Sequence, residues 1–263
     1  MARADNDEPA QLVAYIKTPD QADSGESRVD HWKGLWDGAY RQATDIADPR
    51  FNIAGWNDSF SGAPIAASDM REWLDATLDN IRAHDPANVL EIGCGTGMIL
   101  FGLLPHVDHY TGTDLSPHAL DTIRGELGSD ELAKVTLLNQ PADGLQGLAE
   151  KSFDTVIINS VAQYFPSADY LTGVLKRASE LVRDGGTIYL GDIRNLDWLK
   201  AFHTAVELHQ APGHLGTAEL ATRIDTRIKR DSELLLSEAY FRGLTDQLPR
   251  VNNVHVNLKR GHG

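Results

Sequence analysis

The sequence predicts an α/β fold in which a mostly parallel sheet carries helices on both faces. Strand-like and helix-like segments alternate between residues 88 and 191, which is the pattern of parallel strands joined by right-handed crossovers. One expected strand, 153–159, is apolar almost throughout, as in strands that are buried on both faces. A glycine-rich loop follows the expected strand at 88–92 and leads directly into a helical pattern.

The individual elements follow from hydrophobic periodicity and from capping residues. Before the sheet, a helical stripe of apolar residues extends from Met70 to Ile81, and Asp69 with Glu72 can form a capping box at its start. Ser116 is a capping residue followed by proline, so it is expected to open a helix. The remaining expectations are strands at 88–92, 109–113, 134–138, 153–159, 187–191 and 251–258, helices at 98–104 and 169–182, a turn at 184–186, and helical structure from about 195 to 245.

These patterns divide the chain into three parts. The sequence predicts a loose acidic arm at residues 1–27 and a helical cap or lid at residues 28–84. It predicts a ligand-binding core at residues 85–263, with a helical insertion at 195–245. In the cap, Trp32, Leu35, Trp36 and Tyr40 fall on one helical face. These rings and Trp56 either pack on the core or form a lid that excludes water and offers an aromatic face to a cation.

Composition excludes several classes of protein. The 263 residues correspond to between one and two domains, and 41% hydrophobic residues are enough for an ordinary core. A formal net charge of −14 argues against a nucleic-acid partner. The single cysteine, Cys94, excludes a disulfide framework and multi-cysteine metal sites, and it is expected to be a packing residue. No apolar segment resembles a membrane span or a signal peptide, so a cytoplasmic protein is expected.

The glycine loop and the acid that follows it predict a cofactor. Residues 89–98 read Val-Leu-Glu-Ile-Gly-Cys-Gly-Thr-Gly-Met, which lets a ligand lie against bare backbone at a helix N-terminus. Asp114 lies seventeen residues after Gly97, at the end of the next strand, where a carboxylate can accept both ribose hydroxyls. Met98 stands where a dinucleotide motif has glycine. Glu91 would repel a pyrophosphate but not a cationic sulfonium or ammonium.

This acid-plus-glycines pattern resembles motif I of class I S-adenosylmethionine-dependent methyltransferases, which have a Rossmann-like fold. The chain is similar, over about residues 28–261, to the methyltransferase domains embedded in nonribosomal peptide synthetases. Those domains N-methylate an aminoacyl group held as a thioester on a carrier protein. The resemblance rests on segments 51–60, 89–97, 110–116, 159–165 and 191–194. It implies S-adenosylmethionine as cofactor, no metal, and a carrier protein or synthetase as a partner.

The resemblance also implies which residues bind the cofactor. Gly93, Gly95 and Gly97 would hold its amino-acid end, with Glu91 behind them. Asp114 would bind the ribose, Leu115 would lie on the adenine face, Ala142 and Asp143 would supply a carboxylate to the adenine amino group, and Asn159 and Ser160 would line the methyl-donor side.

Methyl transfer from a sulfonium is an in-line displacement, so alignment of the acceptor is the main requirement. An amine acceptor needs only a weak base, because an α-amino group is partly neutral at pH 7. Asp192, after the fifth strand, and Gln163 and Tyr164, after the fourth, are the candidates to orient it. Asp192 is alternatively a loop or helix-capping acid, and Gln163 and Tyr164 are alternatively half-core residues.

Two further groups have competing interpretations. His203, four residues before Glu207, is a candidate base oriented by that carboxylate, but surface pairs with this spacing are common and metal binding is disfavoured. Arg223, Arg227, Lys229 and Arg230 form the main basic cluster. This cluster is either a solvated helix face or a surface that receives an acidic carrier protein.

The leading functional hypothesis is N-methylation of an amino acid, or of a carrier-bound aminoacyl or peptidyl thioester, in nonribosomal peptide biosynthesis. O- or C-methylation of a free small molecule by a stand-alone tailoring enzyme is the alternative, and a non-catalytic cofactor-binding domain is a third. Two departures from the embedded domains affect this choice. The sequence starts with its own Met1, and relatives continue through one more strand, so we expect either that this sequence is shortened or that a partner segment completes the sheet.

Overall fold

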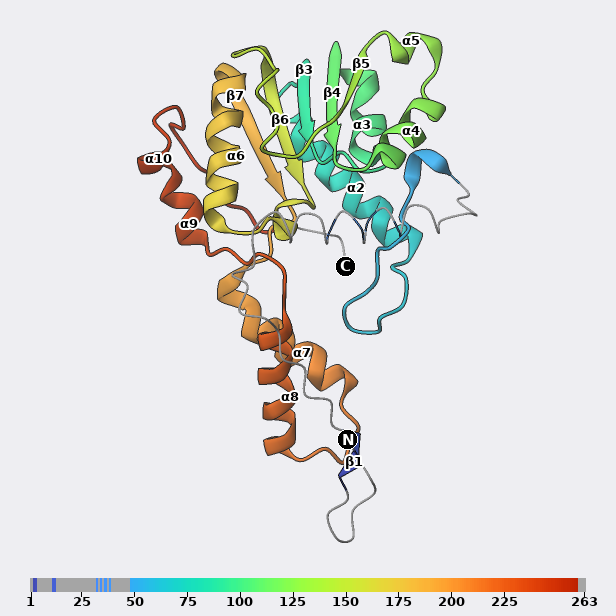
Figure 1. Ribbon diagram of the computed structural model, residues 1–263, viewed down its shortest axis with the longest axis vertical. Helices are drawn as coiled ribbons and strands as arrows, with labels where there is room; N and C mark the ends of the chain where they lie inside the picture. Colours follow the sequence, from blue (N-terminus) through green and yellow to red (C-terminus); the bar gives the residue numbers. More distant parts are fainter. Residues whose placement is uncertain are drawn as a thin grey trace.

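The computed structural model describes residues 48–259 together with residues 2, 3, 11, 12, 32, 34, 36 and 38. Its centre is a parallel five-stranded sheet with the strand order β5-β4-β3-β6-β7 (Figure 1). The strands are β3 (Asn88–Ile92), β4 (His109–Asp114), β5 (Val135–Asn139), β6 (Phe153–Asn159) and β7 (Val182–Gly191). The order changes direction between β3 and β6, and such switch points are where open α/β sheets bind ligands. The predicted α/β class with a parallel sheet is confirmed.

Helices cover both faces of the sheet, and they create two separate cores. On one face, α2 (Ala67–Arg82), α3 (Met98–Leu103) and α4 (Pro117–Glu126) pack against Val89 and Ile157. On the other, α6 (Ala168–Leu181), α9 (Glu238–Arg242) and α10 (Leu244–Gln247) pack against Leu90 and Val156. Neighbouring residues of one strand enter opposite cores because successive side chains of a strand point to opposite faces.

Capping explains where two of these helices begin and corrects one expectation. The Ser116 hydroxyl accepts a hydrogen bond from the Ala119 amide at 3.2 Å, so the predicted cap of α4 is confirmed. The capping box predicted for α2 is wrong. The helix begins earlier, after Ala66, which makes no side-chain cap. Asp69 therefore lies inside the first turn, where its negative charge interacts favourably with the positive end of the helix dipole.

The predicted turn at 184–186 is part of β7. The pairing of β7 with β6 shifts register between the partners Phe153–Val182 and Thr155–Thr187, so the intervening residues form an irregular bulge. Gly185 adopts a φ of +80° there, a conformation that glycine tolerates without strain. Short elements complete the chain: η1 (Pro49–Phe51), η2 (Leu104–His106), α5 (Ser129–Leu132), η3 (Ala162–Tyr164), η4 (Leu196–Trp198), and the antiparallel pair β1 (Ala2–Arg3) and β2 (Gln11–Leu12).

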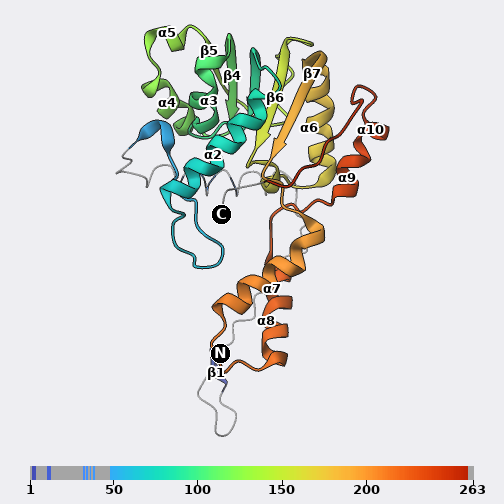
Figure 2. The ribbon, with the colours of Figure 1, turned by 180° about the vertical axis from the view of Figure 1, so that it is seen from behind.

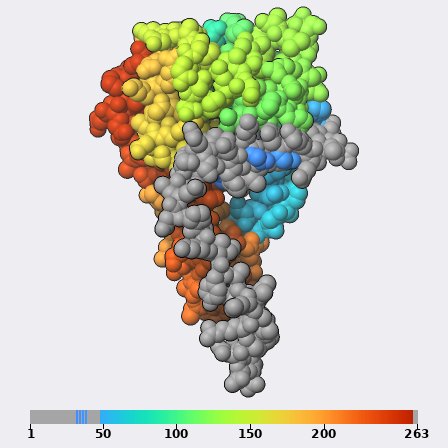
Figure 3. All heavy atoms as spheres, viewed as in Figure 1, coloured from blue at the N-terminus to red at the C-terminus, as the bar shows by residue number. Residues whose placement is uncertain are grey.

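Two helices of the segment expected to be helical, α7 (Leu199–Gln210) and α8 (Thr217–Arg230), extend beyond the carboxyl ends of the strands (Figures 1 and 2). In Figure 3 the broad body that contains the sheet narrows toward this pair of helices, drawn in orange. Arg194 ties them to the end of β7, because its guanidinium forms ion pairs with Asp231, at 2.8 Å, and with Glu233. The later helices α9 and α10 return to the sheet and belong to its core.

The strand predicted at 251–258 is wrong, since residues 251–259 contain neither helix nor strand. Val251 and Val254 still pack against the core around α6, so the apolar residues of the pattern are partly buried as expected. The segment lacks hydrogen bonds to the sheet, because among the described strands β7 is hydrogen-bonded only to β6. The further strand expected to complete the sheet stays a prediction.

The predicted arm and cap are described only in part. In residues 1–27 the structure describes β1 and β2, and the rest of the arm lies outside the described residues. Trp32 and Trp36 have helical backbone, as the periodicity predicts, whereas Leu35 and Tyr40 lie outside the described residues.

Asp154 offers a test of how the start of the sheet is held. Its buried carboxylate accepts hydrogen bonds from the amides of Ala87 (3.1 Å) and Asn88 (2.7 Å), next to β3. We expect Asp154→Ala to lower the unfolding free energy by about 2–4 kcal/mol, because two buried amides lose their acceptor. Urea denaturation measures this change. Asp184→Ala is the matched control, since Asp184 is exposed and should contribute far less. Equal effects of the two substitutions would contradict the assignment.

Candidate functional site

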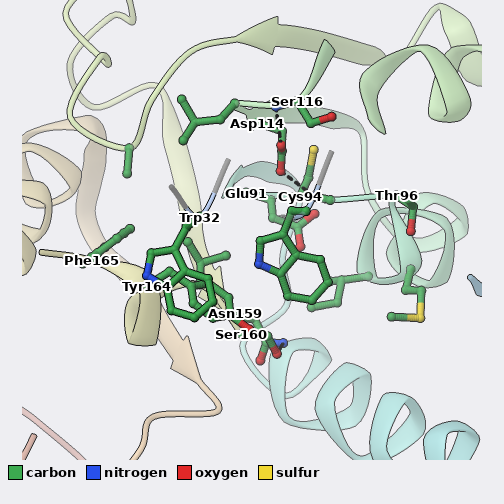
Figure 4. A pocket seen from close by; sticks show the side chains of 18 of the residues that line it. Trp32, Glu91, Cys94, Thr96, Asp114, Ser116, Asn159, Ser160, Tyr164 and Phe165 are labelled. Atoms are coloured by element: carbon green, nitrogen blue, oxygen red, sulfur yellow. Dashed lines mark hydrogen bonds between the residues drawn. The ribbon is translucent and has the colours of Figure 1, made fainter. Parts of the chain in front are cut away.

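A cavity lies at the carboxyl ends of the strands (Figure 4). Each of the four strands β3 to β6 contributes the residues at or just after its end, and aromatic residues from the cap and α2 form the opposite wall. The lining consists of Trp32, Trp36, Asn52, Trp56, Trp73, Glu91, Gly93, Cys94, Gly95, Thr96, Met98, Ile99, Asp114, Leu115, Ser116, Gln140, Ala142, Asn159, Ser160, Val161, Tyr164, Phe165 and Tyr170.

The glycine loop is fastened to the neighbouring strand by its own backbone. The amides of Gly93 and Cys94 both donate to the carbonyl oxygen of Thr113, at 2.8 and 2.9 Å. A Cβ atom on Gly93 would lie 2.5 Å from a methyl carbon of Val161, so only glycine fits there. Gly97 caps α3 with a φ of +89°. The loop therefore brings backbone to the cavity surface at a helix N-terminus.

Asp114 is oriented before any ligand arrives. Its Oδ2 accepts a hydrogen bond from the Gly95 amide and its Oδ1 accepts one from the Ser116 amide, each at 2.8 Å (Figure 4). Each carboxylate oxygen has two lone pairs, so both can accept a second hydrogen bond. The arrangement presents an aimed carboxylate at the cavity wall.

Glu91 behaves differently from what its position in the motif indicates. Its side chain is buried, and the Tyr110 hydroxyl donates to its Oε2 at 2.6 Å. Burial raises the pKa of Glu91 to about 8; Asp114 acts in the same direction, while the Tyr110 hydrogen bond opposes them. At neutral pH the carboxyl is therefore mostly protonated. The role of the Glu91 charge in selecting the ligand stays a prediction.

Two residues that line the cavity have a buried side-chain amide oxygen that accepts no hydrogen bond among the described residues. These oxygens are Oδ1 of Asn159 and Oε1 of Gln140. An unpaired buried acceptor costs about 1–3 kcal/mol, so both oxygens favour a ligand that carries N–H donors. S-adenosylmethionine has such donors in its adenine amino group and its α-ammonium group. Together with the bare loop backbone and Asp114, these residues fit that cofactor.

Aromatic rings form the wall opposite the glycine loop. Trp32 and Trp36 lie 4.5 and 5.6 Å from the ring of Tyr164, and Trp56 lies 5.2 Å from Trp73, measured between ring centroids. Figure 4 shows Trp32 and Tyr164 side by side at this wall. Burial raises the pKa of Tyr164 to about 12, so its phenol is neutral near pH 7.

A polar cluster lies where β6 and β7 end. Ser160 and Asp192, the residues that follow these strands, have φ values of +57° and +56°, which is strained for residues other than glycine. The Asp192 carboxylate accepts hydrogen bonds from the Ser160 hydroxyl, from Trp73 Nε1 at 3.0 and 3.2 Å, and from Lys259 Nζ at 2.7 Å. Asp192 is thus a fixed acceptor rather than a helix cap.

The structure separates the other predicted site residues into two groups. Leu115 and Ala142 line the cavity, whereas Asp143 is exposed beside it and raises the pKa of Tyr170. Gln163 is buried outside the lining, and its backbone carbonyl accepts from the Leu234 amide at 2.7 Å.

His203 does not line the cavity. Its Nε2 lies 3.0 Å from Asp231, between the helices α7 and α8. Its predicted pairing with Glu207 is wrong, because Glu207 instead binds Arg223 (3.3 Å) and Arg227 (2.6 Å). Half of the predicted basic cluster is therefore neutralised within the α7–α8 pair, and Lys229 and Arg230 stay exposed.

Three residues of the site were not singled out from the sequence. Gln140 directly follows β5, so the rule that ligands gather at strand ends could have found it. Trp73 was read only as part of the apolar stripe of α2. Lys259 had no local signal, because its partner Asp192 is 67 residues away.

Burial raises the pKa of the Cys94 thiol, which agrees with a packing role. Among the described residues, His, Cys, Asp and Glu side chains form no group of three or more that could hold a metal ion. No helix in the described ranges is long and apolar enough to span a membrane.

Glu91 gives a prediction about stability. Because the folded protein holds its proton up to about pH 8 while the unfolded chain releases it near pH 4.5, stability should fall as pH rises between these values. Glu91→Gln cannot ionise and keeps an acceptor for Tyr110. Between pH 5 and pH 8.5 we expect the free energy of unfolding of the variant to rise by about 4 kcal/mol relative to that of the parent, measured by urea denaturation.

Glu219→Gln, at an exposed position in α8, is the control and should show no such trend. A constant difference between Glu91→Gln and the parent across this pH range would show that Glu91 is ionised throughout.

Comparisons with known proteins agree with this geometry. A family model described as a methyltransferase domain matches residues 90–188. Chondramide synthase of Chondromyces crocatus is 38% identical over 257 residues, which are 95% of this chain and 6% of that protein. A nonribosomal peptide synthetase of Emericella nidulans is 33% identical over 264 residues, covering 95% of this chain and 10% of that protein. The chain thus spans a tenth or less of the length of these relatives.

The fold is also found in solved structures. Phosphoethanolamine N-methyltransferase 1 of Haemonchus contortus, in complex with phosphoethanolamine and S-adenosylhomocysteine, superposes with a TM-score of 0.50 and 22% identity over 64% of this chain and 32% of that one. That likeness concerns the fold. The matched family model shows that residues 90–188 are a methyltransferase domain, and this domain has the fold of class I S-adenosylmethionine-dependent methyltransferases.

Proposed function

We propose that this methyltransferase methylates the nitrogen of an amino acid, or of an aminoacyl or peptidyl group held as a thioester on a carrier protein, in nonribosomal peptide biosynthesis. The observation that carries the proposal is the Asp192 carboxylate, held by Ser160 and Trp73 beside the cofactor cavity. A fixed carboxylate there favours an acceptor that is cationic when it arrives. The similarity of 95% of the chain to regions of peptide synthetases supports the same acceptor class.

The cofactor would be held by the residues at the ends of β3, β4, β5 and β6. In this proposal Asp114 accepts the ribose hydroxyls, the glycine loop with Gly93, Gly95 and Gly97 receives the amino-acid end, and Asn159 and Gln140 accept N–H groups. Leu115 and Ala142 would contact adenine, with Asp143 nearby, and Ser160 would lie on the methyl-donor side. Glu91, in the strand that leads into the loop, would support the loop as a mostly neutral carboxyl.

Bound S-adenosylmethionine supplies a methyl group on a sulfonium. The protein's own contribution is to orient the acceptor and to keep water out. Asp192 would bind the acceptor in its ammonium form. After the ammonium loses a proton to solvent, Asp192 would position the neutral amine nitrogen. An α-amino group titrates near pH ~8, so a useful fraction is neutral without a strong base. Tyr164, a neutral phenol, would contact the acceptor, whereas His203 and Gln163 lie outside the cavity lining and would act only through neighbouring residues.

A carrier protein is the partner that this function requires. Carrier-bound substrates would approach from the side of the strand ends, where α7 and α8 extend beyond the sheet (Figure 1). Lys229 and Arg230 are exposed at the end of α8 and could meet an acidic carrier. Arg223 and Arg227 contribute less in this proposal, because Glu207 already compensates their charge.

The role of Asp114 in cofactor binding can be measured directly. Asp114→Ala should weaken the binding of S-adenosylhomocysteine by about tenfold to more than a hundredfold in calorimetry, since hydroxyl bonds to a charged acceptor contribute ~1.5–3 kcal/mol. Asp121→Ala removes an exposed carboxylate of α4 and should leave binding unchanged. Undiminished binding by Asp114→Ala, or tight binding of NAD, would exclude this site.

The acceptor can be identified by mass spectrometry. With an amino acid loaded on a carrier protein, we expect a methyl group on the α-nitrogen, located by tandem fragmentation. The free amino acid should react more slowly, because it lacks the binding energy of the carrier and its arm. Asp192→Asn should lower kcat by about tenfold or more while changing S-adenosylhomocysteine affinity little. A methyl group on oxygen or carbon, or equal rates with untethered molecules, would favour the stand-alone tailoring enzyme instead.

A further inference from the structure

The polar cluster at the ends of β6 and β7 already contains an amine. The side chain of Lys259 reaches back from the segment 251–259 and places its Nζ 2.7 Å from Oδ1 of Asp192. The same nitrogen lies 4.1 Å above the centroid of the Trp73 ring. A primary ammonium is thus held by a carboxylate and an aromatic face at once, which are the two groups that recognise alkylammonium ions most strongly.

The contacts around this ammonium are built rather than incidental. The side chain of Asp192 is only 18% exposed, and its carboxylate is held from other directions by the indole N–H of Trp73 and the hydroxyl of Ser160. Trp73 therefore performs two tasks, since its N–H orients the carboxylate and its face receives the cation. The strained backbone at Ser160 and Asp192 brings both side chains to one point.

The cluster adjoins the cofactor cavity. Trp73 and Ser160 both line the cavity, while Asp192 and Lys259 stand just behind them. The Asn159 amide donates to the Ser160 hydroxyl at 3.0 Å, so a continuous set of hydrogen bonds links the cavity wall to the ammonium.

We propose that Asp192, Trp73 and Ser160 form an ammonium subsite for the methyl acceptor, and that Lys259 occupies this subsite as an internal mimic which the acceptor amine must displace. The inference rests on the proposed N-methylation and goes beyond it by naming a competing group within the chain. A lysine ammonium and an α-ammonium share the charge and the three N–H donors that the subsite recognises.

The segment that carries Lys259 is suited to displacement. Residues 251–259 make no helix or strand, and Leu258, the neighbour of Lys259, is 76% exposed. Burial lowers the pKa of Lys259, while Asp192 acts in the opposite direction. The ammonium is therefore partly desolvated, and it regains hydration when it leaves.

Binding of a simple ammonium tests the subsite without methyl transfer. L-leucinamide, which carries a primary amine, and 4-methylpentanamide, which lacks it, would be titrated by calorimetry at pH 7 with S-adenosylhomocysteine present. Lys259→Met keeps the length of the side chain and removes its charge. We expect this variant to bind L-leucinamide about tenfold more tightly than the parent, because one cation–π and ion-pair competitor is gone. Binding of 4-methylpentanamide should not change.

Two further variants define the specificity. Lys176→Met removes an exposed lysine of α6 and should bind L-leucinamide like the parent. Asp192→Asn should abolish the preference for L-leucinamide over 4-methylpentanamide, both alone and combined with Lys259→Met. Thermal unfolding of each variant, followed by circular dichroism, confirms that the proteins compared are folded.

The outcomes separate this inference from the proposed function. Unchanged or weaker L-leucinamide binding by folded Lys259→Met would overturn the subsite, even if N-methylated products form. Tighter binding by Lys259→Met without N-methylation of any acceptor would retain the ammonium subsite and reject the proposed function. If both hold, Lys259→Met should also lower the KM for the aminoacyl acceptor about tenfold and leave kcat unchanged, whereas a lysine that positions Asp192 for catalysis would lower kcat when removed.

Discussion

The parallel pairing of β3 with β4 on one side and β6 on the other determines where every polar group of the site lies. The register sets Ile92 opposite Thr113 and Glu91 opposite Ile157, so the three strands end at nearly the same level. The loop after β3 can then hydrogen-bond to the Thr113 carbonyl, which aims its glycines at the cavity. A slip by one residue would exchange the two faces of β3 and move Val89 and Leu90 into each other's cores.

Several polar side chains lie at these strand ends, where burial limits their contact with water. The protein accommodates each of them in a different way. Glu91 keeps its proton, which avoids a buried charge. Asp114 stays beside backbone amides that can stabilise a carboxylate. Asn159 and Gln140, which line the cavity, each retain an amide oxygen that accepts no hydrogen bond among the described residues. Such exceptions to hydrogen-bond satisfaction are expected where a ligand completes the set.

The two halves of the site rest on different supports. The cofactor half depends on the buried sheet and its helices, and the wall of Trp56 and Trp73 faces it from outside the sheet. The acceptor half depends on the turn after β7, where Asp192 faces Trp73 and Arg194 binds Asp231. Changes in the α7–α8 pair would therefore reach the acceptor half through two residues of one turn. Trp73 and Ser160, which line the cavity, join the two halves through their hydrogen bonds to Asp192.

Local signals in the sequence were enough for the sheet and for much of the cofactor side. The bounds of β3 and β6 agree with the prediction residue for residue, because a run of buried apolar residues between polar breaks is a property of the segment itself. The glycine loop, the acid at the end of β4 and the Ser116 cap were likewise readable from neighbours in the chain. The lining of the cavity includes most of the residues expected to bind cofactor, since parallel strands bring their ends together.

Tertiary structure decided what depends on partners distant in the chain. Apolar alternation at 251–258 describes side chains, but a strand also forms hydrogen bonds to a neighbouring strand, and none of the described strands pairs with this segment. His203 meets Asp231 instead of Glu207 because packing of α8 on α7 brings a different carboxylate to it. The protonation of Glu91 and the ammonium on Asp192 follow from burial and from contacts across the fold. Sequence spacing contains no information on either, because desolvation is a property of the surrounding volume and not of the segment.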